Sequence, residues 1–121
     1  MSNRQITAHR GQRLAGRLSV PGDKSIAHRA LILGSLARET TFVRNVPDSA
    51  DITATLRCLN QLGVHCERVD DAVSVAGLDG RRYKQPGEPL DCGGSATTMR
   101  LLLGAIAGRG AKTTLIGNES L

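Results

Sequence analysis

The chain has 121 residues and a formal net charge of +5, which is enough length for one small domain or for part of a larger one. Only 2% of the residues are aromatic while 40% are hydrophobic, so a core must be built mainly from aliphatic side chains. Three cysteines without C-x-x-C spacing argue against a disulfide framework and a zinc site, and favour a reducing compartment. No apolar run reaches the ~18 residues of a membrane span. The sequence therefore predicts a cytoplasmic protein with no membrane contact.

The position of the excess charge is more informative than its size. Residues 1–40 hold seven Lys and Arg against two acidic residues, whereas residues 41–121 hold nine of each sign. The excess favours an anionic ligand near the N-terminal part, and a solvated basic N-terminus explains the charge equally well. A pI of about 9.7 raises nucleic acid as a partner. The low aromatic content and the lack of a recognised DNA- or RNA-binding motif argue against that class.

Apolar spacing and turn residues predict the secondary structure of the first half of the chain. The second helix has Asp48 or Ser49 as its N-cap and Gly63 as its stop signal. The first helix is apolar on nearly every face, which is typical of a buried helix. The predicted elements are a strand over 14–20, this first helix over 25–37, a strand over 41–46, the second helix over about 49–62, and a hairpin of 64–69 and 72–76.

The second half of the chain begins the same pattern again. A loop over 77–89 precedes a predicted strand over 89–92, a helix over 95–107 and a strand over 113–116. Ser25 and Ser95 are 70 positions apart, as are Gly34 and Gly104. The repeated unit is thus β-α-β-α-β-β, present once in full and begun a second time. The sequence predicts an α/β fold that stops within its second repeat.

Two strand-turn-helix junctions carry the residues suited to binding anions. The first is P-G-D-K-S-I-A-H-R over residues 21–29, and the second is L-D-C-G-G-S-A-T-T-M-R over residues 90–100. Helix N-termini present free backbone N–H groups and a partial positive charge. Arg29 and Arg100 oppose the helix dipole in a first turn, which is unfavourable unless an anion compensates. The alternative for each junction is that Ser25 and Ser95 are simple N-caps.

Other candidate sites are weaker. G-D-K-S lacks the glycines of a nucleotide-binding phosphate loop, which excludes a nucleoside triphosphatase. Cys92 has no base at fixed spacing and is interpreted as a small buried residue. His28 is expected to face a ligand or solvent. No histidine has partners at metal-ligand spacing, so no metal site is predicted.

The two junctions resemble the two N-terminal signatures of 5-enolpyruvylshikimate-3-phosphate synthases. The matching strings are P-G-D-K-S-I-x-H-R-A-L and L-D-C-G-x-S-x-T-T-M-R-L-L-L-G, and the closing I-G-N-E-S-L is also similar. The resemblance implies the inside-out barrel fold of enolpyruvyl transferases, with three β-α-β-α-β-β units in each of two domains. Residues 1–13 would then lead from the missing second domain. Residues 14–121 would be part of the N-terminal domain, with repeat one over about 14–77 and repeat two begun over about 88–121.

The resemblance also implies an activity and a set of binding residues. The family transfers the enolpyruvyl group of phosphoenolpyruvate to the 5-hydroxyl of shikimate 3-phosphate, in the shikimate pathway to chorismate and the aromatic amino acids, without metal or organic cofactor. Lys24, Ser25 and Arg29 would bind shikimate 3-phosphate, with Lys24 also acting electrostatically in catalysis. The phosphoenolpyruvate pocket would be lined by Lys24, Gly94, Ala96 and Thr97, with Arg100 as a further candidate.

Two departures from the family pattern affect that pocket. Gly94 stands where Asn is common, and Ala96 stands where Gly is common. Family members with Ala at the second position tend to tolerate the herbicide glyphosate. The family's acid-base carboxylates would lie beyond Leu121, so we expect the chain to be an enzyme fragment that is inactive alone. The alternative is a non-catalytic anion-binding or phosphate-binding module of the same fold.

Overall fold

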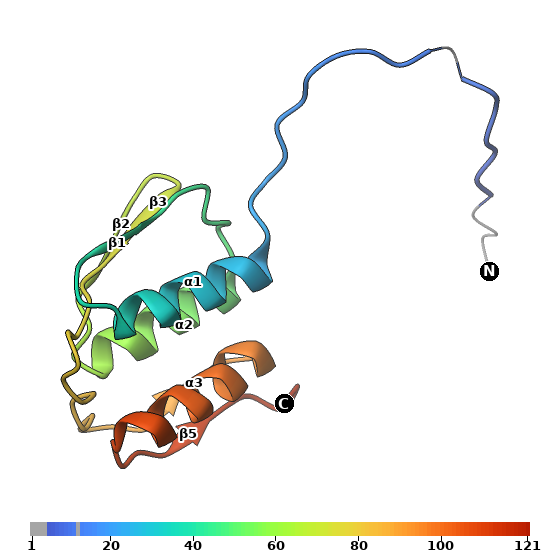
Figure 1. Ribbon diagram of the computed structural model, residues 1–121. Helices are drawn as coiled ribbons and strands as arrows, with labels where there is room; N and C mark the ends of the chain where they lie inside the picture. The colour runs from blue at the N-terminus through green and yellow to red at the C-terminus, as the bar shows by residue number, and fades with distance from the viewer. Residues whose placement is uncertain (1–4, 12) are drawn as a thin grey trace.

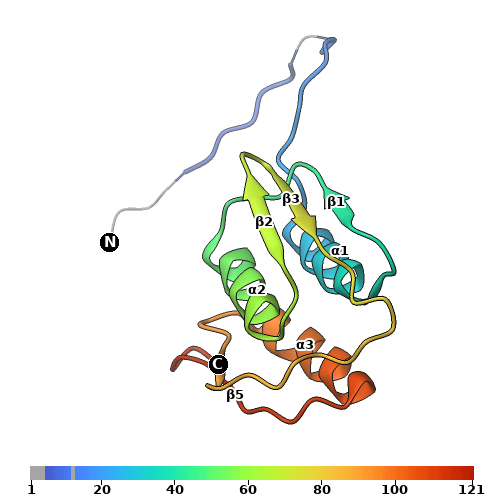
Figure 2. The same ribbon diagram turned by 90° about the vertical axis from the view of Figure 1, so that its left-hand side faces the viewer.

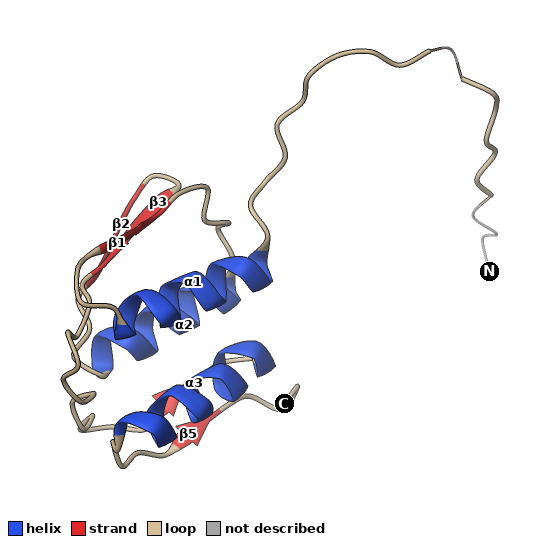
Figure 3. Cartoon of the chain, viewed as in Figure 1, coloured by secondary structure: helices blue, strands red, loops and turns tan. Residues whose placement is uncertain are grey.

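The computed structural model describes residues 5–11 and 13–121, and it confirms a mixed α/β architecture (Figure 3). The order of helices and strands agrees with the sequence prediction from the first helix onward. The elements are α1 (Lys24–Leu36), β1 (Thr41–Val43), α2 (Ala50–Gln61), β2 (Cys66–Val69), β3 (Ala72–Val75), β4 (Leu90–Asp91), α3 (Ala96–Arg109) and β5 (Leu115–Ile116). None of the helices in this part of the chain combines the length and apolarity that a membrane crossing requires.

The strands form two separate sheets. β1, β3 and β2 form an antiparallel sheet in that order, with Thr41 opposite Val75 and Cys66 opposite the same residue. The predicted hairpin is confirmed, and Figure 2 shows β3 between its two neighbours. β4 and β5 pair in parallel, and α3 connects them along the chain. Figure 1 shows α1 and α2 lying between the three-stranded sheet and α3.

The predicted strand over 14–20 is wrong. Residues 13–23 form no strand, and Leu14 and Leu18 are 95% and 81% exposed. Figure 1 shows this segment running away from the packed body before α1 begins. A strand requires a neighbour for its backbone groups, and here the contact that reaches the body is a 3.4 Å hydrogen bond that Asn45 Nδ2 donates to the Val20 carbonyl. Alternating apolar residues show that a segment can pair as a strand, but they do not show that a partner strand is present.

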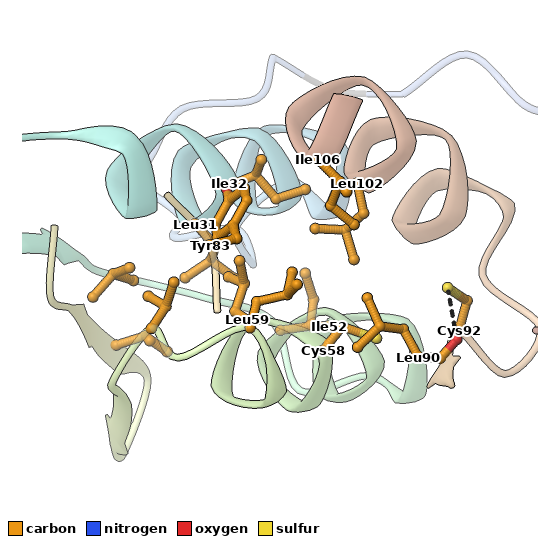
Figure 4. Close-up of a cluster of buried hydrophobic side chains, with 14 of the residues drawn as sticks. Leu31, Ile32, Ile52, Cys58, Leu59, Tyr83, Leu90, Cys92, Leu102 and Ile106 are labelled. Atoms are coloured by element: carbon orange, nitrogen blue, oxygen red, sulfur yellow. Dashed lines mark hydrogen bonds between the residues drawn. The ribbon is translucent and has the colours of Figure 1, made fainter. Parts of the chain in front are cut away.

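The core lies between the three helices and the larger sheet (Figure 4). As the composition requires, it is mostly aliphatic. Cys92 is fully buried within it, which confirms its interpretation as a small core residue, and burial raises the pKa of its thiol. The neighbouring Cys58 has its pKa raised to about 12 by burial, so its reactive thiolate is scarce at neutral pH. Core side chains labelled in Figure 4 include Leu31, Ile52, Leu59, Leu90, Leu102 and Ile106.

The prediction that α1 is buried on nearly every face is wrong for one face. Ile26 and Leu33 are 69% and 65% exposed on α1. Leu103 on α3 is similarly half exposed. A strong apolar pattern shows that a helix has the composition for complete burial, and in this structure other parts of the chain cover only one side of it.

Candidate functional site

The N-termini of the three helices lie together. Lys24 at the start of α1 forms an ion pair with Asp51 in the first turn of α2, with 2.5 Å between Nζ and Oδ2. Thr98 in the first turn of α3 donates a hydrogen bond to the Asp51 carbonyl at 3.3 Å. In Figure 1 all three N-termini lie at the right-hand ends of the helices. The partial positive charges of three helix ends therefore point to one region.

The first junction presents its charges on the surface. Lys24, Ser25 and Arg29 are all exposed. Ser25 is not the N-cap, because Asp23 Oδ1 accepts the hydrogen bond from the Ile26 amide at 2.7 Å. An Asp cap places negative charge on the helix end, so an anion bound here is recognised by side-chain cations more than by free amides. The Arg29 guanidinium donates to the Ser25 carbonyl at 2.8 Å, which holds these two residues close to each other.

The second junction presents free backbone N–H groups in place of charged side chains. Ser95 is the N-cap of α3, as the alternative in the sequence analysis had it, and its buried side chain accepts from the Thr98 amide at 3.1 Å. Ser95 is uncharged, and the amides of Ala96 and Thr97 precede the first α-helical backbone bond, which Met99 donates to the Ser95 carbonyl. Ala96 is exposed and Thr97 is half-buried. This helix end can therefore receive an anion on its own N–H groups.

The glycines before α3 differ in what surrounds them. Gly93 has a φ of +57°, a left-handed conformation that favours glycine, and its amide donates to Asp91 Oδ1 at 2.8 Å. Gly94 faces the C-terminal segment, where a Cβ would lie 3.0 Å from Ser120 Oγ and 3.2 Å from the Asn118 amide nitrogen. The I-G-N-E-S-L segment thus forms one wall of the turn that leads into α3.

Sequence reasoning missed the residues that connect the two junctions. One of them is Asp51, the partner of Lys24. His28 is fully buried, so the expectation that it faces a ligand or solvent is wrong. Its Nδ1 is 2.7 Å from the hydroxyl of Thr55, which in turn lies 2.7 Å from that of Thr98. The sequence does contain a signal for Thr55, because it is a polar residue within the apolar stripe of α2, where a buried hydroxyl needs a hydrogen-bond partner.

The remaining candidates are less enclosed. Arg100 is exposed on α3, one turn beyond Ala96. Across residues 5–11 and 13–121, no group of three or more His, Cys, Asp or Glu side chains is arranged to hold a metal ion. The site is thus a shared end of three helices, with cations on one helix and uncharged donors on another.

Comparison with known proteins decides the family. The family model described as EPSP synthase (3-phosphoshikimate 1-carboxyvinyltransferase) matches residues 8–121, which is nearly the whole chain. The chain belongs to the EPSP synthase family. EPSP synthase abbreviates the 5-enolpyruvylshikimate-3-phosphate synthase of the resemblance drawn from the two junctions, and that resemblance is confirmed.

Individual EPSP synthases agree closely with this chain. The 3-phosphoshikimate 1-carboxyvinyltransferase of Acidithiobacillus ferrooxidans is 49% identical over 114 residues, covering 92% of this chain and 26% of the relative. That of Lactiplantibacillus plantarum is 47% identical over 108 residues, covering 89% of this chain and 25% of the relative. The chain therefore spans about a quarter of the length of the curated relatives it matches.

Solved structures show the same fold. One structure of the EPSP synthase from Acinetobacter baumannii superposes with a TM-score of 0.81 at 34% identity, covering 88% of this chain and 24% of that chain. Another structure of the Acinetobacter baumannii enzyme gives 0.79 at 35% identity. The described helices and sheets are thus about a quarter of an EPSP synthase fold.

Proposed function

We propose that this chain forms part of the substrate site of a 3-phosphoshikimate 1-carboxyvinyltransferase. The reaction transfers the enolpyruvyl group of phosphoenolpyruvate to the 5-hydroxyl of shikimate 3-phosphate and releases phosphate. The observation that carries the proposal is the convergence of the two junctions at the shared helix end, where Lys24 meets Asp51 and Thr98 meets the same residue's carbonyl. Two anionic substrates must be brought together, and two adjacent anion-binding ends supply that proximity.

The two junctions have different roles in this proposal. Lys24, Ser25 and Arg29 bind the phosphate side of shikimate 3-phosphate, because they form the exposed, cationic surface of α1. Thr97 and the amides around Gly94 and Ala96 bind phosphoenolpyruvate at the α3 end, because they lie together at the start of one helix. Each charge-assisted hydrogen bond of this kind contributes about 1.5–3 kcal/mol. Lys24 serves both ligands, and Arg100 adds a cation beside the α3 end.

The rest of the assignment follows from the family. Residues 1–13 lead from a second domain, and residues 14–121 belong to the N-terminal domain. The acid-base groups come from the other three quarters of the family's length, so the residues here act as charge clamps that need no cofactor. We place the protein in the cytoplasm, which is supported by three cysteines that all carry free thiols.

Phosphate release tests this function. The subject is an intact enzyme, meaning a polypeptide of the relatives' full length that includes residues 1–121. We expect it to release phosphate only when both shikimate 3-phosphate and phosphoenolpyruvate are present. The 121-residue chain alone should release none, because the proton-transfer groups are not among its residues.

Two results would contradict the proposal. Binding of shikimate 3-phosphate by the intact enzyme without any turnover would favour the alternative, a non-catalytic anion-binding module. Turnover by the 121-residue chain alone would show that the acid-base groups lie within it. Heat-treated protein and single-substrate reactions serve as controls for phosphate contamination.

A further inference from the structure

A chain of buried polar side chains runs between the three helices. His28 Nδ1 on α1 is 2.7 Å from Thr55 Oγ1 on α2, and Thr55 Oγ1 is 2.7 Å from Thr98 Oγ1 on α3. The Thr98 hydroxyl also lies 2.7 Å from Ser95 Oγ, within hydrogen-bonding distance. Ser95 is 3% exposed and the other three residues are fully buried. A core made of aliphatic residues thus contains one continuous polar path.

Each hydroxyl has a single proton to donate, which limits the possible directions of the hydrogen bonds along this path. Thr98 donates its proton to Ser95 Oγ or to the Asp51 carbonyl, so it accepts in its contact with Thr55. We assign Thr55 as the donor to Thr98 and as the acceptor of the His28 Nδ1–H, because this arrangement leaves the Thr98 proton for Ser95 or Asp51. Burial lowers the pKa of His28, Lys24 and Arg29 lower it further, and Asp51 opposes the shift. The imidazole is thus neutral near pH 7, with its proton on Nδ1.

The path joins the turns that carry the proposed substrate contacts. His28 is adjacent to Arg29 and one helical turn beyond Lys24. Thr98 is adjacent to Thr97. The Nδ1–H group and the hydroxyls form hydrogen bonds only within narrow ranges of distance and angle, whereas aliphatic contacts tolerate sliding. A network of this kind fixes the relative position of α1 and α3 more tightly than Leu or Val would.

One atom of the path has no partner. His28 Nε2 is buried, and no hydrogen-bonding group of residues 5–11 and 13–121 reaches it. A buried polar atom without a partner is unfavourable by about 1–3 kcal/mol, whereas an apolar side chain would avoid that loss. Stability alone therefore does not explain a histidine at this position. Its Nδ1 donor is the group that links α1 to the hydroxyls of α2 and α3.

We propose that His28, Thr55 and Thr98 are positioning residues that hold the two substrate-binding helix ends in register. This role rests on the proposed function, because it assumes that α1 binds shikimate 3-phosphate and α3 binds phosphoenolpyruvate. None of the three touches a substrate. Their contribution is to keep two ligands, bound on different helices, at reacting distance.

The test compares isosteric losses along the path with a matched buried loss elsewhere. Thr55→Val and Thr98→Val remove a hydroxyl with little change of shape, and His28→Leu removes the Nδ1 donor. The control is Ser35→Ala, which removes a buried hydroxyl that lies 2.7 Å from the Tyr83 hydroxyl toward the other end of α1. Each variant of the intact enzyme is assayed for kcat and for phosphoenolpyruvate affinity with and without saturating shikimate 3-phosphate.

We expect a specific division of effects. In Thr98→Val and His28→Leu, kcat should fall about tenfold to a hundredfold, as for a small misplacement of reactants. The factor by which shikimate 3-phosphate changes phosphoenolpyruvate affinity should shrink toward one, while affinity for shikimate 3-phosphate alone should stay within about threefold. His28→Asn should restore both quantities, because its amide places a donor near the Nδ1 position, and His28→Gln should not. Ser35→Ala should lower the melting temperature and leave both quantities unchanged.

The result that would overturn the proposal is equally specific. If Thr98→Val and His28→Leu behave like Ser35→Ala, losing stability while keeping kcat and the coupling factor, the path is structural only. If His28→Leu fails to fold, Thr98→Val together with the Asn and Gln substitutions decides the question by the same two quantities. A wild-type enzyme with no turnover would instead refute the proposed function, and the positioning role would fall with it.

Discussion

The junctions before α1 and before α3 occupy equivalent places in the repeat that the sequence predicts, but the structure builds them differently. The first has an exposed carboxylate cap, Asp23, beside exposed Lys24 and Arg29. The second has a buried, uncharged cap, Ser95, beside the exposed methyl of Ala96. The first end is suited to recognising charge with side chains, and the second to recognising shape with backbone amides.

The strands leading into the two helices differ as well. β4 pairs in parallel with β5, where the Leu90 amide donates to the Thr114 carbonyl at 2.9 Å. The equivalent segment before α1 is in no strand; Asn45 Nδ2 donates to its Val20 carbonyl at 3.4 Å, and a Cβ on Gly22 would lie 1.9 Å from the Asn45 carbonyl oxygen. The comparison teaches that a repeated sequence pattern can give one helix end anchored by a sheet and another that contacts the rest of the structure at Asn45 without strand pairing.

The largest effect should come from filling that close contact. Gly22→Ala places a methyl group against the Asn45 carbonyl, where backbone must move, so we expect a loss of about 3 kcal/mol in the free energy of unfolding. Gly93→Ala meets no atom within 4 Å and should lose only about 1–2 kcal/mol, from its left-handed φ. Thermal unfolding of the two variants of the intact enzyme measures both. Equal losses would show that the first junction is not held by this contact.

The next effect concerns shape recognition at α3. Ala96 puts a methyl group in the first turn, beside the amides proposed to bind phosphoenolpyruvate. We expect the intact enzyme to resist glyphosate, and Ala96→Gly to tighten glyphosate inhibition roughly a hundredfold, which corresponds to about 2–3 kcal/mol of relieved clash. Phosphoenolpyruvate affinity should change little. Inhibition curves at matched phosphoenolpyruvate saturation decide the matter, and superimposed curves would mean that the methyl does not discriminate.

Charge recognition at α1 should give an effect of similar or smaller size. Arg29→Ala should weaken shikimate 3-phosphate binding roughly tenfold to a hundredfold, because one charge-assisted bond is lost. The matched control is Arg38→Ala just beyond the other end of α1, whose side chain is 91% exposed and forms an ion pair with Asp79. Titration calorimetry of the intact enzyme should show little change for the control. Similar losses from both arginines would mean that diffuse charge binds the ligand.

The smallest expected effect is a pH dependence of the unfolding free energy, which arises from the buried His28 imidazole. Burial lowers the pKa of His28 from its usual 6.5, with Lys24 and Arg29 adding to the shift and Asp51 opposing it. Stability from the neutral imidazole is then fully present above pH 6.5 and is lost as pH falls through 6.5 toward the folded pKa. We expect the intact enzyme to lose more unfolding free energy below pH 6.5 than its His28→Asn variant. Parallel curves for the two proteins would contradict a lowered pKa.

Local features of this chain could be predicted from the sequence. Ser49 and Ser95 are N-caps, and each accepts a hydrogen bond from a backbone amide only three residues further along the chain. The hairpin turns at Asp70, whose φ is +55°. The two junction motifs likewise lie within single runs of about ten residues. Such features depend on neighbours in sequence, which is why propensity and spacing identify them.

Features that depend on distant partners could not be predicted. The pairing of residues 14–20 requires a strand to receive it, and the exposure of Ile26 and Leu33 depends on what covers α1. The contacts of Thr55 with His28 and Thr98 join residues 27 and 43 positions apart. Nothing in the spacing of single polar residues within three separate helices indicates that they meet. The site's charges were therefore visible in the sequence, while the network between them required the structure.

The affinities of the Lys24→Ala variant for the two substrates test most directly whether the two junctions form one site. Lys24 stands between them, since its partner Asp51 also accepts from Thr98 of α3. Titrations of the intact variant with each substrate should show weaker binding of both shikimate 3-phosphate and phosphoenolpyruvate, each by roughly tenfold or more. Weakened binding of one substrate with unchanged binding of the other would contradict a shared site.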